Sequence, residues 1–156
     1  MNLSKMRKPE LIACVQSMMV DKKWGCYTKD ALITFWDDLS QNAVGIAYCD
    51  IDDMHSLNSR YGHTGTDNRI AFTIEQVRSD DVVACRWCNG DELIFILKSG
   101  NSYEFCKRMQ REFKELNIRA TFACSDTVTE CFDTIEPLDN KVQRSKNMNR
   151  KGVILR

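Results

Sequence analysis

Two clusters of carboxylate side chains are the residues in this chain best suited to chemistry. The first is the segment DIDD at residues 50–53, directly after an apolar run, and the second is Asp91 with Glu92, directly before another. Strand ends can bring such carboxylates together at one edge of a sheet, where their oxygens would hold Mg²⁺ and with it the phosphates of a substrate. A single Asp in a turn is most often only a solvated turn residue. The hypothesis therefore depends on both clusters flanking strands.

The strands next to the clusters follow from short apolar runs. Residues 43–49 are predicted to form a buried strand that ends at the first cluster. Residues 82–85 and 93–97 are predicted to pair as a hairpin, because Asn89-Gly90 between them suits a tight turn with positive φ. The second cluster should then lie at the tip of this hairpin.

The other elements complete an α/β or α+β sandwich. Helical spacing predicts a helix at 9–20, with Pro9 in its first turn, and a helix at 29–40 capped by Thr28. Strands alternating with helices around one hairpin indicate a single layered domain. Further helices are expected at 53–60, 67–78, 102–115 and 135–147, with an interruption at Gly62, and further strands at 118–124 and 153–155.

Composition limits the class of protein. The chain has 156 residues, with 22 Lys and Arg against 22 Asp and Glu, so its formal net charge is zero. This balance argues against a basic nucleic-acid coat and a polybasic membrane binder. The apolar runs are far shorter than a membrane span needs, and the N-terminal segment does not resemble a secretory signal. We expect a cytoplasmic protein with no nucleic-acid or membrane partner.

The eight cysteines do not suggest a disulfide framework, because no secretory signal accompanies them. Cys49 and Cys124 lie in apolar runs and are expected to be small buried hydrophobic residues. Cys85 and Cys88 form one CxxC pair, but a zinc site needs about two further ligands and no second pair accompanies them.

Four segments, in order, resemble the GGDEF domain family, the diguanylate cyclases. RWCNGDEL at residues 86–93 resembles the segment that names the family, and DIDDMHSLNSRYGHTGTD at 50–67 resembles its DxDxFKxxNDxxGHxxGD segment. Asp21, Gly25 and Lys29 resemble its opening DxLTGLxNR, and SKNMNR at 145–150 its closing AKxxGR. The resemblance covers about residues 21–156.

The resemblance implies an α+β palm-like sandwich: a central, mainly antiparallel sheet flanked by helices. It implies a GGDEF-like catalytic domain at 21–156, preceded by a helix at 1–20 that could serve dimerisation. It also implies the site residues. Asp50, Asp91 and the Ile51 carbonyl would hold Mg²⁺ or Mn²⁺, and Glu92 would lie beside the reacting hydroxyl. Asn58 and Asp67 would bind the guanine edge. Gly90 would let the backbone approach the phosphates, and Lys146 and Arg150 would hold the terminal phosphates.

Two features of these site residues can be argued physically. A carboxylate at Asp67 suits guanine, because it accepts from N1–H and N2–H₂, which adenine lacks. Lys146 and Arg150 are four residues apart, so we expect both on one side of a helix end. Arg78 and Asp81 resemble the family's product-inhibition motif, although farther from Asp91 than usual.

The chain also departs from the family pattern. Asn89 replaces the first glycine of the motif, one extra residue lies between Trp87 and the GDE core, and Leu93 replaces Phe. Thr66, Ser59, Met54 and His55 stand where the family has Gly, Asp, Phe and Lys. His63, next to Gly62, is expected to hold its loop rather than to act in catalysis. These changes leave the named metal and phosphate residues in place.

Three functions remain open at this stage. The first is a homodimeric diguanylate cyclase that makes cyclic di-GMP, a second messenger, from two GTP with release of pyrophosphate. The second is a cyclic oligonucleotide synthase like the minimal CRISPR-type polymerases of anti-phage signalling, using ATP or mixed nucleotides. The third is a degenerate module that binds GTP or a cyclic dinucleotide without turnover. Because the net charge is zero, nucleotide binding is expected to depend strongly on Mg²⁺.

Overall fold

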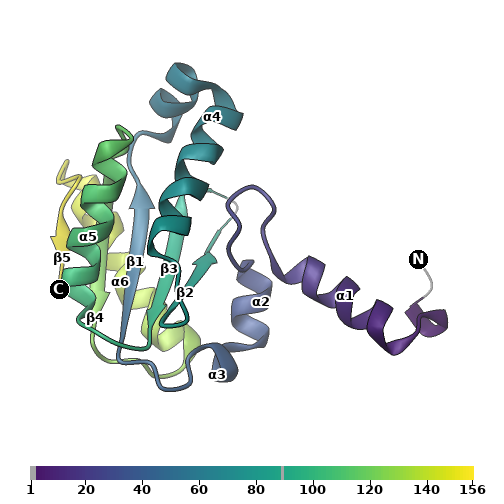
Figure 1. Ribbon diagram of the computed structural model, residues 1–156. Coiled ribbons are helices and arrows are strands. Elements are labelled where there is room, and N and C mark those ends of the chain that lie inside the picture. The colour runs from purple at the N-terminus through teal and green to yellow at the C-terminus, as the bar shows by residue number, and fades with distance from the viewer. Residues whose placement is uncertain (1–2, 89) are drawn as a thin grey trace.

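A five-stranded sheet forms the centre of the protein (Figure 1). The structure is a computed structural model and describes residues 3–88 and 90–156. The strand order is β2-β3-β1-β4-β5, and only the β4–β5 pair is parallel. The strands are β1 (Gly45–Ile51), β2 (Val82–Arg86), β3 (Glu92–Leu97), β4 (Ala120–Ser125) and β5 (Ile154–Leu155). The expected α+β fold with a mainly antiparallel sheet is confirmed.

Helices cover both faces of this sheet (Figure 1). They are η1 (Leu3–Lys5, a 3-10 helix), α1 (Lys8–Met19), α2 (Lys29–Thr34), α3 (Trp36–Leu39), α4 (Met54–Val77), α5 (Ser102–Glu115) and α6 (Cys131–Asn147). Along β1, Ala47, Cys49 and Ile51 belong to the core cluster that includes α4 and α5, while Ile46 and Tyr48 belong to the cluster with α2, α3 and α6. All of β1 is buried because both faces of a strand with period two are covered.

Three helices differ from the expected ones. The helix expected at 29–40 is divided at Phe35, whose backbone (φ −112°, ψ 26°) is not helical; Thr28 caps its first half, as expected. The two helices expected at 53–60 and 67–78 are continuous as α4 except at Gly62, where φ is 73°. Such a φ favours glycine.

Helix α6 begins earlier than the sequence suggested. Pro137 was expected near the helix start, but the helix begins at Cys131 and Pro137 lies inside it. The buried residues Cys131, Thr134 and Ile135 continue the helical spacing ahead of the proline. Packing on the sheet therefore overrides the tendency of proline to end a helix.

Helix α1 projects away from the rest of the protein (Figure 1). It has no buried residue, although Leu11, Val15 and Met18 recur at helical spacing and are 37%, 38% and 58% exposed. Within the described residues, no helix is both long and apolar enough to cross a membrane. Six cysteines are buried and Cys88 is exposed at the hairpin.

The central position of β1 predicts a large effect of a core truncation. Ile46 is fully buried, so Ile46→Ala should lower the free energy of unfolding by about 2–5 kcal/mol, measured by denaturant titration. Ile12→Ala removes the same atoms from a side chain that is 46% exposed on α1, and should change stability by less than about 0.5 kcal/mol. Similar losses in both variants would contradict this account of the core.

Candidate active site

Pairing between β1 and β3 brings the two acidic clusters together. Asp50 lies opposite Glu92 in the antiparallel register, and the backbone N–H of Ile51 donates to the carbonyl of Asp91 at 3.0 Å. The two clusters thus meet at one edge of the sheet, as strand ends were expected to arrange them. The hairpin is held at the same place, because the N–H of Trp87 donates to the carbonyl of Glu92.

These carboxylates share a poorly solvated space. Burial raises the pKa of Asp91 above its usual value, and the negative charge of Asp50 raises it further. Burial likewise raises the pKa of Glu92, with the charges of Asp50 and Asp91 adding to it. The raised pKa values mean that this edge of the sheet disfavours its own negative charge and would be stabilised by a cation.

Lys146, near the C-terminal end of α6, supplies one such cation. Its Nζ lies 2.5 Å from Asp50 Oδ1, 3.3 Å from Asp52 Oδ1 and 3.5 Å from the carbonyl oxygen of Ile51. Burial lowers the pKa of Lys146, but the hydrogen bond and charge of Asp50 outweigh it, so the pKa is raised overall. Gln143 donates to the other oxygen of Asp50 at 3.1 Å.

The oxygen set suits a divalent metal ion. The Lys146 ammonium already contacts two of the expected ligands, Asp50 and the Ile51 carbonyl, so these oxygens do converge on a positive charge. The charge of Asp50 acts on Asp91, the third expected ligand. Within the part of the chain that the structure describes, no three acidic, imidazole or thiol side chains form a metal cluster. The residues fit Mg²⁺ or Mn²⁺ held by two carboxylates and a main-chain carbonyl.

The rest of the first acidic cluster is tied into the fold. Asp52 accepts hydrogen bonds from Thr121 Oγ1 at 2.9 Å and from the N–H of Gly152 at 3.0 Å, and its side chain is fully buried. Asp53 pairs with Arg119 and Lys151, both at 2.7 Å. Only Asp50 of this cluster faces the hairpin, so it is the carboxylate best placed to act with Asp91.

The expected base-binding residues lie on α4, on either side of the break at Gly62. Asn58 is half-buried before the break, and Asp67 follows it. The indole Nε1 of Trp24 donates to Asp67 Oδ1 at 2.8 Å. One oxygen of Asp67 is therefore already oriented by the protein.

Two further residues anchor the hairpin and were not identified as site residues from the sequence. Arg86 donates to the carbonyl of Gly90 at 3.1 Å, pairs with Asp21 Oδ2 at 3.0 Å, and stacks 3.9 Å above the ring centroid of Trp24. Trp24 thus contacts both Arg86, through its ring, and Asp67, through its indole N–H. The signal available in the sequence was that Asp21 and Arg86 both lie in the motif-like segments.

Comparison with known proteins identifies the family. The family model described as diguanylate cyclase, GGDEF domain, matches residues 27–131, which is more than half of the chain. The chain belongs to the GGDEF domain family. No curated protein matches the chain significantly.

Solved structures show that the fold is shared. The coiled coil and GGDEF domain of DgcB from Caulobacter crescentus, solved with c-di-GMP, is 16% identical with a TM-score of 0.72, covering 95% of this chain and 90% of that chain. A diguanylate cyclase/phosphodiesterase from Caldicellulosiruptor saccharolyticus is 20% identical with a TM-score of 0.70, covering 94% and 96%. The active GGEEF domain of a Vibrio cholerae diguanylate cyclase is 18% identical with a TM-score of 0.61, covering 78% and 93%.

Arg150, which was expected to hold the terminal phosphates together with Lys146, lies elsewhere than expected. Helix α6 ends at Asn147, so Arg150 follows the helix and does not share a helical face with Lys146; that expectation is wrong. The backbone turns back here, with the N–H of Arg150 donating to the carbonyl of Ser145, and Asn149 has a φ of 56°. The side chain of Arg150 lines a small hollow with Met148 rather than meeting the carboxylates.

The residues resembling an inhibition motif do not pair. Arg78 donates to the carbonyl of Gly25 at 2.9 Å, whereas Asp81 accepts from Ser99 Oγ at 3.0 Å. Both are exposed, at the end of β2 away from the hairpin tip, so a role in product inhibition stays a prediction. His63 is exposed too.

Gly90 lies close to the side chain of Glu92. A Cβ added there would lie 3.2 Å from Glu92 Oε2, which itself accepts from the N–H of Asp91. The expectation for Asn89 falls outside the described residues. A side chain at Gly90 would therefore require the Glu92 carboxylate to shift by a few tenths of an ångström.

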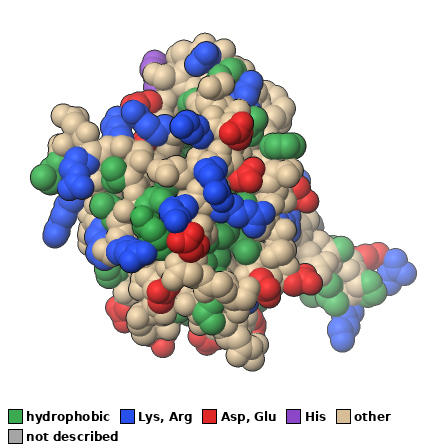
Figure 2. Space-filling view, turned by 60° about the vertical axis from the view of Figure 1, so that its left-hand side comes forward, with side chains coloured by type: hydrophobic (Ala, Val, Ile, Leu, Met, Phe, Trp, Pro, Cys, Tyr) green, Lys and Arg blue, Asp and Glu red, His purple; other side chains and the backbone are tan. Residues whose placement is uncertain are grey.

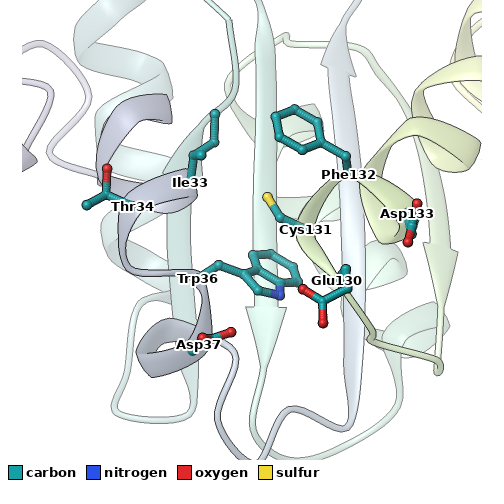
Figure 3. A pocket seen from close by; sticks show the side chains of 8 residues that line it. All are labelled: Ile33, Thr34, Trp36, Asp37, Glu130, Cys131, Phe132 and Asp133. Atoms are coloured by element: carbon teal, nitrogen blue, oxygen red, sulfur yellow. The ribbon is translucent and has the colours of Figure 1, made fainter.

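Another hollow, which none of the acidic-edge residues lines, lies beside α2 and α3 (Figure 3). Its volume is about 440 Å³, and it separates α2 and α3 from the start of α6. Trp36 faces it, and its charged lining residues are Asp37, Glu130 and Asp133. A lining with acidic but no basic residues does not suit phosphate groups, so this hollow is not the nucleotide site.

The Asp21–Arg86 pair predicts a dependence of stability on pH. Burial raises the pKa of Asp21, but hydrogen bonds from the Trp24 N–H and from Arg86 outweigh it, so the pKa is lowered. A lowered pKa stabilises the fold above the ordinary pKa of about 4 and loses this effect as pH falls through the lowered value. The stability difference between wild type and Asp21→Asn should therefore shrink from pH 7 to pH 3, measured by urea unfolding. Asp38→Asn, at an exposed site, should show no such trend; equal trends would contradict the pairing.

Proposed function

We propose that this GGDEF domain is a diguanylate cyclase that converts two GTP into cyclic di-GMP. The observation that carries the proposal is the β1–β3 register, which sets Asp50 opposite Glu92 and beside Asp91. In each of two steps, a ribose 3′-oxygen would bond to the α-phosphorus of the other nucleotide. The bond from that phosphorus to the bridging oxygen would break, and pyrophosphate would leave while the hydroxyl proton is lost.

Each residue has a role that suits its position. Asp50, Asp91 and the Ile51 carbonyl would hold Mg²⁺ or Mn²⁺, which when bound supplies charge stabilisation to the attacking and leaving oxygens. Lys146 would turn from Asp50 to the terminal phosphates once that charge is neutralised. Glu92 would lie beside the reacting hydroxyl.

Base selection would depend on Asp67. The hydrogen bond from Trp24 fixes Oδ1 of this carboxylate, and Oδ2, which lies 4.0 Å from Lys23 Nζ, would accept from guanine N1–H or N2–H₂. Asn58, before the break in α4, would bind the same edge of the base. An adenine, which lacks these two donors, would leave Oδ2 of the half-buried carboxylate without a hydrogen bond from the base.

Two half-sites are needed for a symmetric cyclic product, so the proposal includes a homodimer. Helix α1 is the candidate interface, because its exposed apolar stripe of Leu11, Val15 and Met18 has no covering element among the described residues.

The activity is tested by incubating the protein with a panel of nucleoside triphosphates and Mg²⁺, with products identified by mass. We expect cyclic di-GMP from GTP, at least a hundredfold loss in Asp91→Asn, and near wild-type activity in the exposed control Asp80→Asn. The affinity for GTP should also fall strongly when excess chelator removes the divalent metal ion.

Other outcomes select another function. Preference for ATP would contradict the role of Asp67 and favour a different cyclic oligonucleotide. Tight GTP binding without any product would favour a binding module. Equal activity in Asp91→Asn and wild type would rule out the proposed site.

The role of α1 predicts an effect on assembly. Leu11→Gln with Val15→Gln should shift the protein toward monomer, measured by sedimentation over a concentration series, and lower GTP turnover in parallel. Ala13→Gln alters another side of the same helix and should leave both unchanged. A dimer that persists in the double variant would exclude α1 as the interface.

A further inference from the structure

A second cavity, of about 600 Å³, lies outside the acidic edge. It is enclosed by the first half of α4, the C-terminal half of α5 and the start of β4. The residues that define its character are Arg60, Gln110, Arg111, Lys114, Arg119 and Gly152. Its volume is within the range of small-molecule sites, which is about 300–1,000 Å³.

The cavity is basic. Its described lining contains cationic side chains from three segments and no carboxylate. Within the described residues, Arg60, Arg111 and Lys114 form no ion pair, whereas Arg119 pairs with Asp52 and Asp53. Figure 2 shows one face of the protein, on which many Lys and Arg side chains lie over the upper and middle part with Asp and Glu side chains among them. Because the net charge of the chain is zero, the lining of this cavity is a local excess of positive charge.

Helix electrostatics does not explain this gathering. Lys114 lies in the last turn of α5, where a cation compensates the helix dipole. Arg60 belongs to α4, however, and Arg119 to the segment before β4, so dipole compensation at one helix end cannot account for their convergence.

Part of the cavity wall is fixed. The side chain of Arg119 packs against Gly152, where an added Cβ would lie 2.9 Å from Arg119 Cδ. Gln110 Nε2 donates to the Gly152 carbonyl at 2.9 Å. Arg119 is further held by Asp53 at 2.7 Å and Asp52 at 3.5 Å. The guanidinium is thus positioned before any ligand arrives.

This cavity is separate from the proposed nucleotide site. Residues two apart on a helix point about 200° from each other, so Arg60 and Asn58 lie on opposite sides of α4. The cavity is therefore reached from the other side of that helix. Its lining has no aromatic ring on which a base could stack.

We propose that the cavity binds a polyphosphate anion, either free pyrophosphate or the phosphate tail of a nucleotide. Linked phosphates match several separate cations better than a single small anion does, and guanidinium groups bind phosphate oxygens in pairs. Without a stacking surface, recognition rests on the phosphates and is independent of the base. The proposal does not depend on the cyclase activity.

The test is calorimetric titration with inorganic pyrophosphate, in chelator, at two salt concentrations. We expect one site whose affinity falls at higher salt, and at least a tenfold loss in the double variant Arg111→Gln, Lys114→Gln. The charge-matched control Lys5→Gln, Lys8→Gln alters cations near and on α1 and should bind as wild type does. The charge-keeping variant Arg111→Lys, Lys114→Arg should retain most of the affinity.

A second arm separates this cavity from the acidic edge and identifies the source of the phosphates. Lys146→Gln should keep pyrophosphate binding, and GDP and ADP should bind equally. If GDP and ADP bind equally but more weakly than pyrophosphate, the result favours the free anion as ligand. If they bind equally and at least as tightly as pyrophosphate, it favours the phosphate tail of a nucleotide. Loss of binding in Lys146→Gln but not in Arg111→Gln, Lys114→Gln would overturn the proposal. Equal loss in the Lys5, Lys8 control, no binding, or strong preference for one base would overturn it too.

Discussion

The antiparallel register between β1 and β3 is the constraint on which the acidic edge depends. With Asp50 opposite Glu92, the strand that ends in one cluster and the hairpin that carries the other are fixed to each other by backbone hydrogen bonds. A slip of one residue would turn Asp50 to the other face of the sheet. It would also bury the wrong set of apolar residues, since both faces of β1 are covered. The core therefore specifies the site.

Gathering carboxylates in this way has an electrostatic cost, and Lys146 offsets it. Its ammonium contacts Asp50 and Asp52 while Asp91 and Glu92 lie near by with raised pKa values. Removing the partner of a buried charge is usually more costly than the pair is worth. An ammonium near the end of α6 can leave when a stronger cation arrives, whereas a cation in the sheet could not. The same residue can therefore stabilise these carboxylates and, under the proposed function, contact the phosphates.

The sequence predicts the parts of the site that depend on local pattern. Strand ends, turn residues and apolar runs were enough to bring Asp50 and Asp91 to one edge, because period and turn chemistry are local. The contacts of Arg86 and Trp24 were not predictable, because each joins residues far apart in the sequence. Arg86 is 65 residues from its partner Asp21, and Trp24 is 43 residues from its partner Asp67. Arg150 was misjudged because the end of α6 is set by a backbone turn at Asn149 rather than by periodicity.

Although its net charge is zero, this domain has one acidic region and one basic region. The acidic edge is stabilised by a cation. In the basic cavity Arg60, Arg111 and Lys114 form no ion pair among the described residues, whereas Arg119 lines the cavity while pairing with Asp52 and Asp53. Asp52 in turn lies 3.3 Å from Lys146. Arg119 of the cavity and Lys146 of the acidic edge therefore contact the same buried carboxylate, so Asp52 has a cationic partner from each of the two regions.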